Sequence, residues 1–450
     1  MSSDLMSLLS LGSSALAAAN SGVAIATNNA TNANTVGYSR QTVDFESNLL
    51  GGVTTGATGR EASALLQQRI RASAGSLAHS SQTQASISDL EDTMTTGGSI
   101  DAQLSSLFSR IAQASASPTD ATLRAAVVQA TRDLAVGING RAAQVASARQ
   151  DADVRIGQNM PQAGQLALQL ADANRIVAKS GDPAALDHRE KIAKQLSAFV
   201  GGSARIDPDG NMRFVLDGGA VLVDGTHAAT LQTSTDPTTG YQIAQVVDGG
   251  TTRDVSAQLG GSIGADVTFR DKTAKTTADQ LDQLAYDTAT AFNAQHSANA
   301  ALDGSTGNLM FVPPTAVSGA ASLLAIDPGL DASSDKLALG SPGGAIGDNS
   351  GGLALFALST TKNAVGGTRT LTDAAVSIIG DLGSAGAMAK SDNERDQIVD
   401  EHLAGLRDSL SGVDTQEELT NLARFQSASS AITKFVSSIN DMLTNLIDRL

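Results

Sequence analysis

The chain contains no cysteine and no tryptophan, and aromatic residues make up only 3% of its 450 residues. The lack of cysteine excludes disulfide bonds, structural thiolate zinc sites and thiol catalysis in any compartment. Aromatic side chains usually fill dense cores, so their scarcity beside abundant Ala, Ser and Gly favours long helices with thin cores. The length is enough for two or three domains.

Clusters of Lys and Arg are also missing from the sequence, and the formal net charge is −16. Nucleic acid and anionic membranes are therefore not expected partners, and proteins are. No stretch approaches 18 consecutive apolar residues, which predicts no membrane span. The amino terminus lacks the basic start and the apolar core of a cleaved secretory signal, so these residues alone would indicate a cytoplasmic protein.

Residues that could carry chemistry are sparse. The five histidines form no pair at ligand spacing, and no Gly-x-Gly occurs that could hold a phosphate. Asp207-x-Asp209-Gly210-Asn211 resembles the start of a calcium loop but lacks the later Glu, so we interpret it as a turn. We interpret Asp187, His188 and Glu190 as a solvated polar helix surface. No catalytic, cofactor-binding or metal-binding residue is predicted, and the protein is not expected to be an enzyme.

The carboxy-terminal residues 413–450 contain no Gly or Pro and repeat apolar side chains every seven residues. This spacing is typical of a coiled-coil helix, which needs a partner to bury its stripe. One heptad position holds Leu422, Ser429, Val436, Leu443 and Leu450, and the other holds Phe425, Ile432, Ile439 and Leu446.

The amino terminus carries a thinner stripe that would suit such a partner. Leu9, Leu16 and Val23 alternate with the small residues Gly12, Ala19 and Ala26, which allow close approach of a second helix. Crowded Asn and Thr side chains follow from Asn28, and Gly37 permits positive φ, so the helix is expected to end there.

Four motifs resemble bacterial flagellar rod, hook and hook-associated proteins. The Asn-rich run ending in Gly37-Tyr38-Ser39-Arg40-Gln41 is similar to the amino-terminal motif of that family. The hook-associated branch is indicated by Ser411-Gly412-Val413-Asp414 with Glu417-Glu418-Leu419 and Arg424-Phe425-Gln426, by Leu186-Asp187-His188-Arg189-Glu190-Lys191-Ile192, and by Phe292-Asn293-Ala294-Gln295-His296. Three departures are Ser429, where relatives usually have Tyr, Asn299, where they have Gly, and a short stretch between Phe311 and Asp327, where larger relatives insert an outer domain.

The predicted fold is mainly α: an elongated helical bundle with terminal coiled-coil helices and a small inserted antiparallel β domain. Helical spacing covers 60–200, β-prone runs separated by Asp-Gly and Asp-Pro turns cover 204–253, and helix resumes near Thr277. We expect the β domain to lie farthest from the termini, with few contacts across its boundary. The predicted domains are 1–50 (helix and Asn-rich motif), 51–200 (helical), 201–262 (β), 263–410 (helical with a Gly-rich loop at 340–352) and 411–450 (coiled-coil helix).

The resemblance implies a structural adaptor that joins the flagellar hook to the filament and polymerises through its terminal helices. It further implies export by the flagellar type III system without a cleaved signal, to the extracellular flagellum. The implied partners are the hook protein, the next junction protein, other copies in an axial ring and an export chaperone. The implied subunit interface comprises Leu9, Leu16, Val23, Gly37, Tyr38, Arg40, Leu422, Phe425, Ile432, Val436, Ile439, Leu443, Leu446 and Leu450.

Two alternatives stay open. The chain could be another axial protein, such as flagellin, hook or hook-associated protein 3; flagellins lack the Gly-Tyr-Ser-Arg element, and the Asp187-His188-Arg189 region is unlike hook. A secreted enzyme carried on an axial scaffold would need a deep pocket with perturbed carboxylates in residues 201–262.

Overall fold

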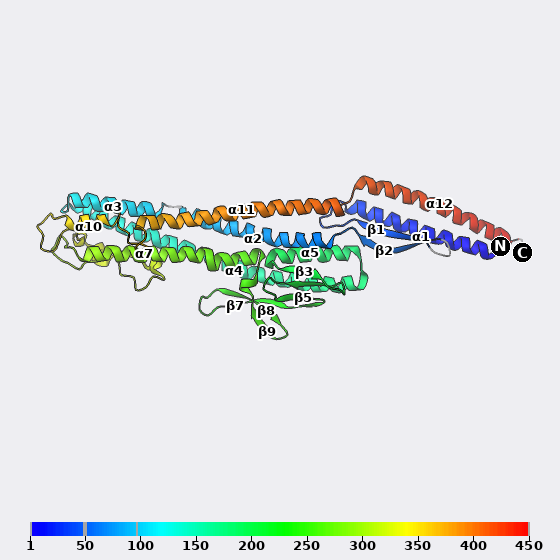
Figure 1. The fold of residues 1–450 in the computed structure, drawn as a ribbon, viewed down its shortest axis with the longest axis horizontal. Helices are drawn as coiled ribbons and strands as arrows, with labels where there is room; N and C mark the ends of the chain where they lie inside the picture. The colour runs from blue at the N-terminus through cyan, green and yellow to red at the C-terminus, as the bar shows by residue number, and fades with distance from the viewer. Residues whose placement is uncertain (1, 48–51, 96–97, 449–450) are drawn as a thin grey trace.

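Long helices packed side by side give the molecule an extended shape (Figure 1). The computed structural model describes residues 2–47, 52–95 and 98–448. We use the term rod for the helices α2 (Ala64–Thr95), α3 (Ile100–Ala116), α4 (Ala121–Ser180), α5 (Pro183–Val200), α6 (Gly261–Thr268), α7 (Ala274–Ser297) and α11 (Leu371–Ser411). The predicted fold class, mainly α with a small β region, is confirmed.

The helix boundaries follow from local chemistry. Asp120 caps α4 by accepting hydrogen bonds from the backbone N–H groups of Thr122 and Leu123. Gly181 ends this 60-residue helix in the left-handed conformation, and Asp182 caps α5 directly afterwards. At about 1.5 Å per residue, α4 alone is ~90 Å long.

Residues 298–370 form short elements and loops at the end of the rod beside α3 (Figure 1). These elements are α8 (Ala320–Leu323), α9 (Pro328–Ala332), the 3-10 turn η3 (Ser334–Lys336) and α10 (Ser350–Ala357). The predicted Gly-rich loop therefore ends where α10 begins, at Ser350.

The chain leaves the rod after α5 to form two antiparallel sheets, which we call the strand module. Their strand orders are β3-β4-β5-β6 and β7-β8-β9. The strands are β3 (Ser203–Ile206), β4 (Met212–Val215), β5 (Val221–Asp224), β6 (His227–Ala228), β7 (Thr230–Thr235), β8 (Gln242–Asp248) and β9 (Thr251–Asp254), followed by the 3-10 turn η1 (Ser256–Gln258). Helix resumes at Gly261, earlier than the sequence indicated, and passes through a π-helical turn, η2 (Phe269–Thr273), into α7.

The strand module does not lie where we expected. It packs beside the middle of the rod, while α3 and α10 occupy the end farthest from the termini (Figure 1). The reason is that α5 runs back along α4, so the chain enters and leaves the module halfway along the rod. The expectation that the module is the most distant part is wrong.

The module also lacks a core of its own. Phe214 and Leu222 from its strands are buried in one hydrophobic cluster with Met160 and Leu170 of α4 and Leu196 of α5. A second cluster joins the other part of α4 to α2, α3, α7 and α11. The expectation of few contacts across the module boundary is therefore wrong, because α4 and α5 bury their apolar faces on these strands.

The two ends of the chain pair with each other. Helices α1 (Ser2–Asn32) and α12 (Thr415–Ile447) run antiparallel beyond the end of the rod, with the termini together at the tip (Figure 1). A Cβ at Gly12 would lie 2.6 Å from Val436 Cγ2, and one at Gly22 would lie 2.6–2.8 Å from the Phe425 ring. The small residues of α1 thus permit the close approach that its stripe predicted. We call α1 and α12 the terminal pair.

A β-hairpin beside α1 was missed in the sequence. β1 (Gln41–Ser47) pairs with β2 (Val53–Arg60), so the segment 53–60 is strand and its assignment to a helical domain is wrong. The β-prone residues Thr42, Val43 and Phe45 carried the available signal. The Phe45 ring lies 5.8 Å from the Phe425 ring, which fastens the hairpin to α12.

The amino-terminal helix is more apolar than we expected from the absence of a long run of apolar residues. Its segment Asp4–Asn32 is long and apolar enough, by length and composition, to cross a membrane, with a mean hydropathy of 1.4. The small residues of α1 raise this average without making a run of large apolar side chains. Core helices and signal sequences meet the same criterion, and here the apolar stripe faces α12.

The shared core predicts the result of excising the strand module. Joining the chain across residues 203–258 with a Gly/Ser linker should abolish the cooperative melting of the α4–α5 region, because it exposes their buried faces. Thermal unfolding followed by circular dichroism measures this. A milder change, Phe214→Ala, should lower the free energy of unfolding by about 3–5 kcal/mol. Unchanged melting of the excised chain would show that the strands are dispensable to the rod.

Candidate functional site

The sequence motifs meet where the terminal pair joins the rod. We call this region the joint and define it by Ser39, Arg40, Arg60, Arg71, Asp187, Glu190, Glu417 and Glu418. These residues come from the loop after α1, the end of β2, and the helices α2, α5 and α12. Segments that are hundreds of residues apart in sequence are thus brought into one network of hydrogen bonds and ion pairs.

Asp187 is the centre of the joint. Its carboxylate accepts hydrogen bonds from Ser39 N and Ser39 Oγ, both at 2.8 Å, and pairs with Arg60 Nη1 at 2.5 Å. Arg60 and Asp187 side chains are each only 11% exposed. Glu190, one helical turn along α5, pairs with Arg71 and lies 3.8 Å from Arg60 Nη2.

This geometry corrects our interpretation of residues 187–190. His188 is exposed, but Glu190 is buried and Asp187 is largely covered, so this is not a solvated surface. The spacing of three between Asp187 and Glu190 places both carboxylates on one helix face, where Arg60 and Arg71 meet them. The two arginines were not predicted, because nothing local to α2 or β2 identifies their partners.

Arg40 links the amino-terminal motif to α12. Its guanidinium pairs with Glu417 Oε1 at 2.5 Å and Glu418 Oε1 at 2.8 Å. Its backbone N–H also donates to Ser411 O at 2.9 Å. Charge-assisted contacts to two adjacent carboxylates fix both the position and the direction of the start of α12.

Tyr38 closes the loop after α1. Its hydroxyl donates to Asn29 Oδ1 at 2.8 Å, and its carbonyl accepts from Arg407 Nη2 at 2.7 Å. Burial, with the carboxylates of Asp187 and Glu418 nearby, raises the pKa of Tyr38 to about 12. Asn29 in turn holds the backbone of Gln41 through bonds of 2.9 Å in both directions. Helix α1 ends at Asn32, so the first residues of the Asn-rich run are helical.

The predicted interface residues fall into three groups. The stripe residues lie on the two packed helices α1 and α12, and most of those described are only half-buried; Ile439 is 2% exposed. Tyr38 and Arg40 make contacts within the chain, while Gly37 has φ +95° at the loop. The side chain of Leu446 and all of Leu450 lie outside what the structure describes. Ser429 Oγ donates to Asn20 Oδ1 at 3.0 Å, which replaces an apolar contact by a polar one in that layer.

Two other motif residues hold the far end of the rod. Asn293 accepts from the N–H groups of Met310 and Phe311 and donates to Phe311 O, all at 2.9 Å. His296 is fully buried, with Nδ1 2.7 Å from Asn308 O and Nε2 accepting from Ala338 N at 2.9 Å. These partners require a neutral ring with its proton on Nδ1, and burial lowers the pKa of His296. Their role here is to fasten loops.

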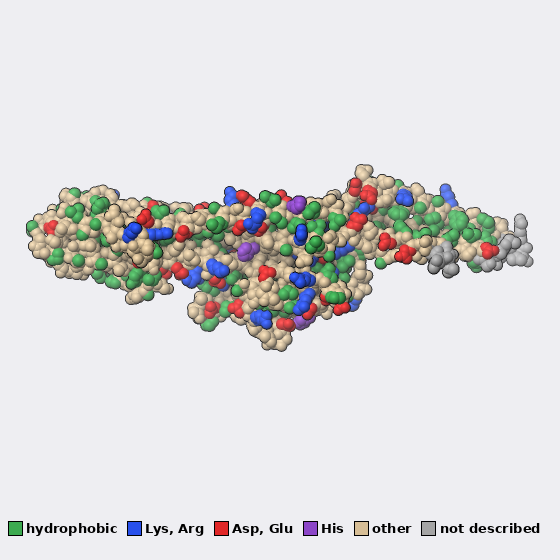
Figure 2. Space-filling model, viewed as in Figure 1, with side chains coloured by type: hydrophobic (Ala, Val, Ile, Leu, Met, Phe, Trp, Pro, Cys, Tyr) green, Lys and Arg blue, Asp and Glu red, His purple; other side chains and the backbone are tan. Residues whose placement is uncertain are grey.

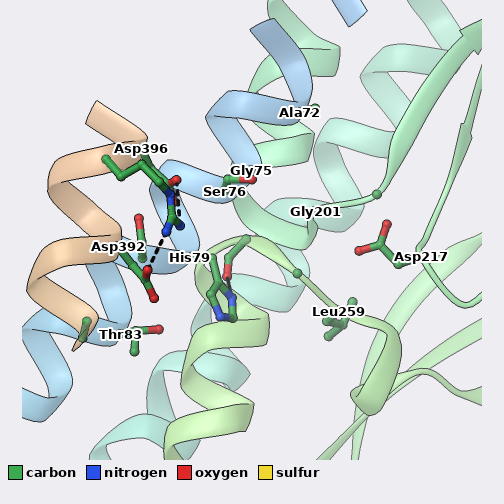
Figure 3. Close-up of a pocket in the computed structure, with 16 residues that line it drawn as sticks. Ala72, Gly75, Ser76, His79, Thr83, Gly201, Asp217, Leu259, Asp392 and Asp396 are labelled. Atoms are coloured by element: carbon green, nitrogen blue, oxygen red, sulfur yellow. Dashed lines mark hydrogen bonds and ion pairs between the residues drawn. The ribbon is translucent and has the colours of Figure 1, made fainter. Parts of the chain in front are cut away.

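A cleft of about 560 Å³ lies between α2, α11 and the Gly-rich ends of the strand module (Figure 3). Figure 3 shows Asp217 across the cleft from Asp392 and Asp396, so the three carboxylates do not converge. Arg395 pairs with Asp392 at 2.7 Å and Asp396 at 3.3 Å. His79 lies 3.2 Å from the carbonyl of Gly261. The arrangement contains no matched acid and base.

A general acid needs a carboxyl group with a raised pKa, and the strand module has a carboxyl group whose pKa is lowered. Asp236 has a lowered pKa because it accepts hydrogen bonds from Thr238 N and Thr239 Oγ1 in an exposed turn. Asp207 likewise accepts from Asp209 N and Asn211 N, as the turn interpretation requires. Among the described residues, no group of three or more His, Asp or Glu is placed to hold a metal ion.

Comparisons with known proteins agree with this architecture. The family model for the flagellar hook-associated protein FlgK helical domain matches residues 87–311. Flagellar hook-associated protein 1 of Escherichia coli (strain K12) is 23% identical, with 98% of this chain and 100% of that protein covered. The Bacillus subtilis (strain 168) protein of that name is also 23% identical, with 96% of each covered. The solved structure of the flagellar hook junction protein FlgK from Burkholderia pseudomallei has a TM-score of 0.68 at 14% identity, covering 76% of this chain and 100% of that chain.

The class of protein defined by the fold and the joint is an elongated, mainly helical structural protein whose two ends meet. The matched model takes in half of the chain, and the chain belongs to the flagellar hook-associated protein 1 family.

Removing the central carboxylate should weaken the joint. Asp187→Ala leaves the largely buried Arg60 without its closest partner, so we expect a loss of about 3 kcal/mol in the free energy of unfolding. Chemical denaturation measures it, and proteolysis between α1 and α2 should become faster. His188→Ala, the exposed neighbour, is the matched control. A similar small effect from both changes would show that the ion pairs do not stabilise the joint.

His296 should make stability depend on pH. Its pKa is lowered in the folded protein, so below about 6.5 the unfolded chain binds a proton that the folded chain does not. Stability should therefore be full above that pH and fall as the pH drops towards 5. Denaturation midpoints measured from pH 7.5 to 5 test this. His296→Gln, which can still donate and accept one hydrogen bond, should flatten the profile, whereas His402→Gln on the exposed face of α11 should not.

Proposed function

We propose that this protein is the structural adaptor between the flagellar hook and filament, and that it polymerises through the terminal pair. The observation that carries the proposal is the incomplete burial of the terminal stripe. Within the chain, Leu16, Val23, Val436 and Leu443 stay half-buried although α1 and α12 pack against each other. Two helices alone cannot enclose such a stripe, so neighbouring copies would complete it.

Exposed apolar side chains on the same two helices support this proposal. Met6 is 62% exposed, Leu419 and Met442 are each 52% exposed, and Phe435 is 45% exposed. Figure 2 shows hydrophobic side chains gathered over the terminal pair. A bundle of terminal pairs around an axis would cover them. It would place the predicted interface residues inside and the rod with its strand module outside.

The joint has a defined part in this proposal. Gly37, Tyr38 and Arg40 would act on the assembly by fixing the direction in which the terminal pair leaves the rod. Each copy in a ring would then present the same angle to its neighbours, as a closed ring requires. The flagellar hook protein, the next junction protein and further copies of the chain are the partners; nucleic acid and membrane are not.

The remaining parts of the proposal follow the family. The protein would be exported through the flagellar type III channel, with a chaperone and without a cleaved signal, and would act in the extracellular flagellum as a structural protein and not as an enzyme. In this setting the apolarity of α1 serves helix packing. Its stripe has a partner helix and loop contacts through Asn29, which favours this use over membrane insertion.

Charge placed in the stripe tests the assembly role. Ile439→Asp with Leu443→Asp would put unpaired carboxylates into the closed bundle, while the rod, which does not contact these residues, should melt normally. We expect the variant to be exported by a null strain but to build no filament, releasing unpolymerised flagellin into the medium.

The matched control is Ser438→Asp with Asn440→Asp, which adds the same charge at exposed positions of α12. Swimming and filament number should be near normal in that strain. Normal filaments in the Ile439/Leu443 strain would remove the basis for assembly through the terminal pair.

A further inference from the structure

Two arginines lie side by side on the exposed face of the strand module. Arg205 of β3 and Arg213 of β4 are directly opposite each other in the antiparallel register, and both are exposed. Residues opposite in such a pair have Cβ atoms about 5 Å apart, and like charges there destabilise the sheet. The nearest acidic group, Asp224, lies 3.8 Å from Arg213 and is itself 59% exposed.

This placement is unusual in a chain with a net charge of −16. Figure 2 shows Lys and Arg side chains over β3 and β5, with Asp and Glu side chains close by. Two adjacent guanidinium groups are a good fit for carboxylates, because each can donate two parallel hydrogen bonds to one carboxylate. A bound acidic surface would turn the like-charge repulsion into attraction.

The chain carries a surface that fits. Glu394, Glu401 and Asp408 recur every seven residues on α11, so they lie on one helix face over about 21 Å. All three are exposed. The closest cations, Lys390 at 3.9 Å from Glu394 and Arg407 at 3.9 Å from Asp408, leave the carboxylates facing solvent. We call these three residues the acidic stripe.

The two surfaces lie on opposite sides of the rod. α11 runs along one edge in Figure 1, and the strand module projects from the other. They cannot meet within one chain, but they can meet between two copies placed side by side. A contact between different surfaces of identical copies, repeated around an axis, closes into a ring.

We propose that Arg205 and Arg213 bind the acidic stripe of a second copy of this chain. This contact forms a lateral interface outside the terminal bundle, and it rests on the proposed assembly into an axial ring. Because its charges are exposed, the interface orients neighbours and weakens with salt more than the apolar bundle does.

Cysteine cross-linking tests the proposal in the full-length protein, because the chain has no cysteine of its own. Ser203→Cys, two residues before Arg205 on the same face of β3, is half-buried, and Ile398→Cys between Glu394 and Glu401 is exposed. The two purified variants are mixed at low ionic strength with a short bismaleimide. We expect a cross-linked heterodimer whose yield falls about fivefold or more at high salt.

Charge reversal supplies the control. Arg205→Glu with Arg213→Glu in the Ser203→Cys chain should lower the yield about as much as salt does, and Glu394→Arg with Glu401→Arg in the other chain should restore it. Gln232→Cys, exposed on the other sheet, should cross-link poorly. No heterodimer at low salt, an equal yield from Gln232→Cys, or arginine-dependent binding to hook protein without self cross-linking would each overturn the proposal.

A cellular measurement separates this inference from the proposed function. If both hold, a strain with Arg205→Glu and Arg213→Glu should build filaments that break off at the junction under shear more often than wild-type filaments. The Ile439/Leu443 strain should build none. Fragility equal to wild type would reject the lateral contact alone, while filaments in the Ile439/Leu443 strain would reject terminal assembly alone.

Discussion

The carboxylate of Asp187 joins parts of the chain that lie far apart in sequence. Through Ser39 it fixes the loop after α1, and through Arg60 it fixes the base of the β-hairpin. Arg40 extends the same network to the start of α12. Both ends of the chain leave the rod at this place, so the direction of the terminal pair depends on these few charge-assisted bonds. The apolar stripe supplies adhesion between helices, but a stripe by itself does not specify an angle to the rod.

The parts of the fold that sequence predicted well are those with local causes. Heptad spacing located both terminal helices, and Asp-Gly and Asp-Pro turns separated the strands. The β1–β2 hairpin was missed because its strands are largely polar and β2 is rich in Thr and Gly, which a two-stranded ribbon against a helix tolerates. The π-helical turn at Phe269–Thr273 gave no periodic signal of its own.

The site was less predictable than the fold for a physical reason. The family motifs named Tyr38, Arg40 and residues 187–190, but ion pairs between α5 and residues more than 100 positions earlier have no sequence pattern. The sequence indicated that Asp187 and Glu190 are surface residues. The interpretation failed because Arg60 and Arg71 pack over both carboxylates and bury them. The strand module was also only partly predictable. Its alternating residues indicated that one face of the strands is buried, but they did not indicate that α4 and α5 cover that face.

The 60-residue helix α4 belongs to both hydrophobic clusters, with Val127 to Ala152 in one and Ile156 to Ala173 in the other. No loop or domain boundary interrupts it where one cluster gives way to the next. A pull or twist along the long axis therefore loads the backbone hydrogen bonds of a single helix, which lack one donor at Pro161, and not a seam between side chains that could slide. Because α4 runs through both hydrophobic clusters, a torque applied at one end of the helix acts on both of them. The side-chain packing of one cluster can still loosen without the other.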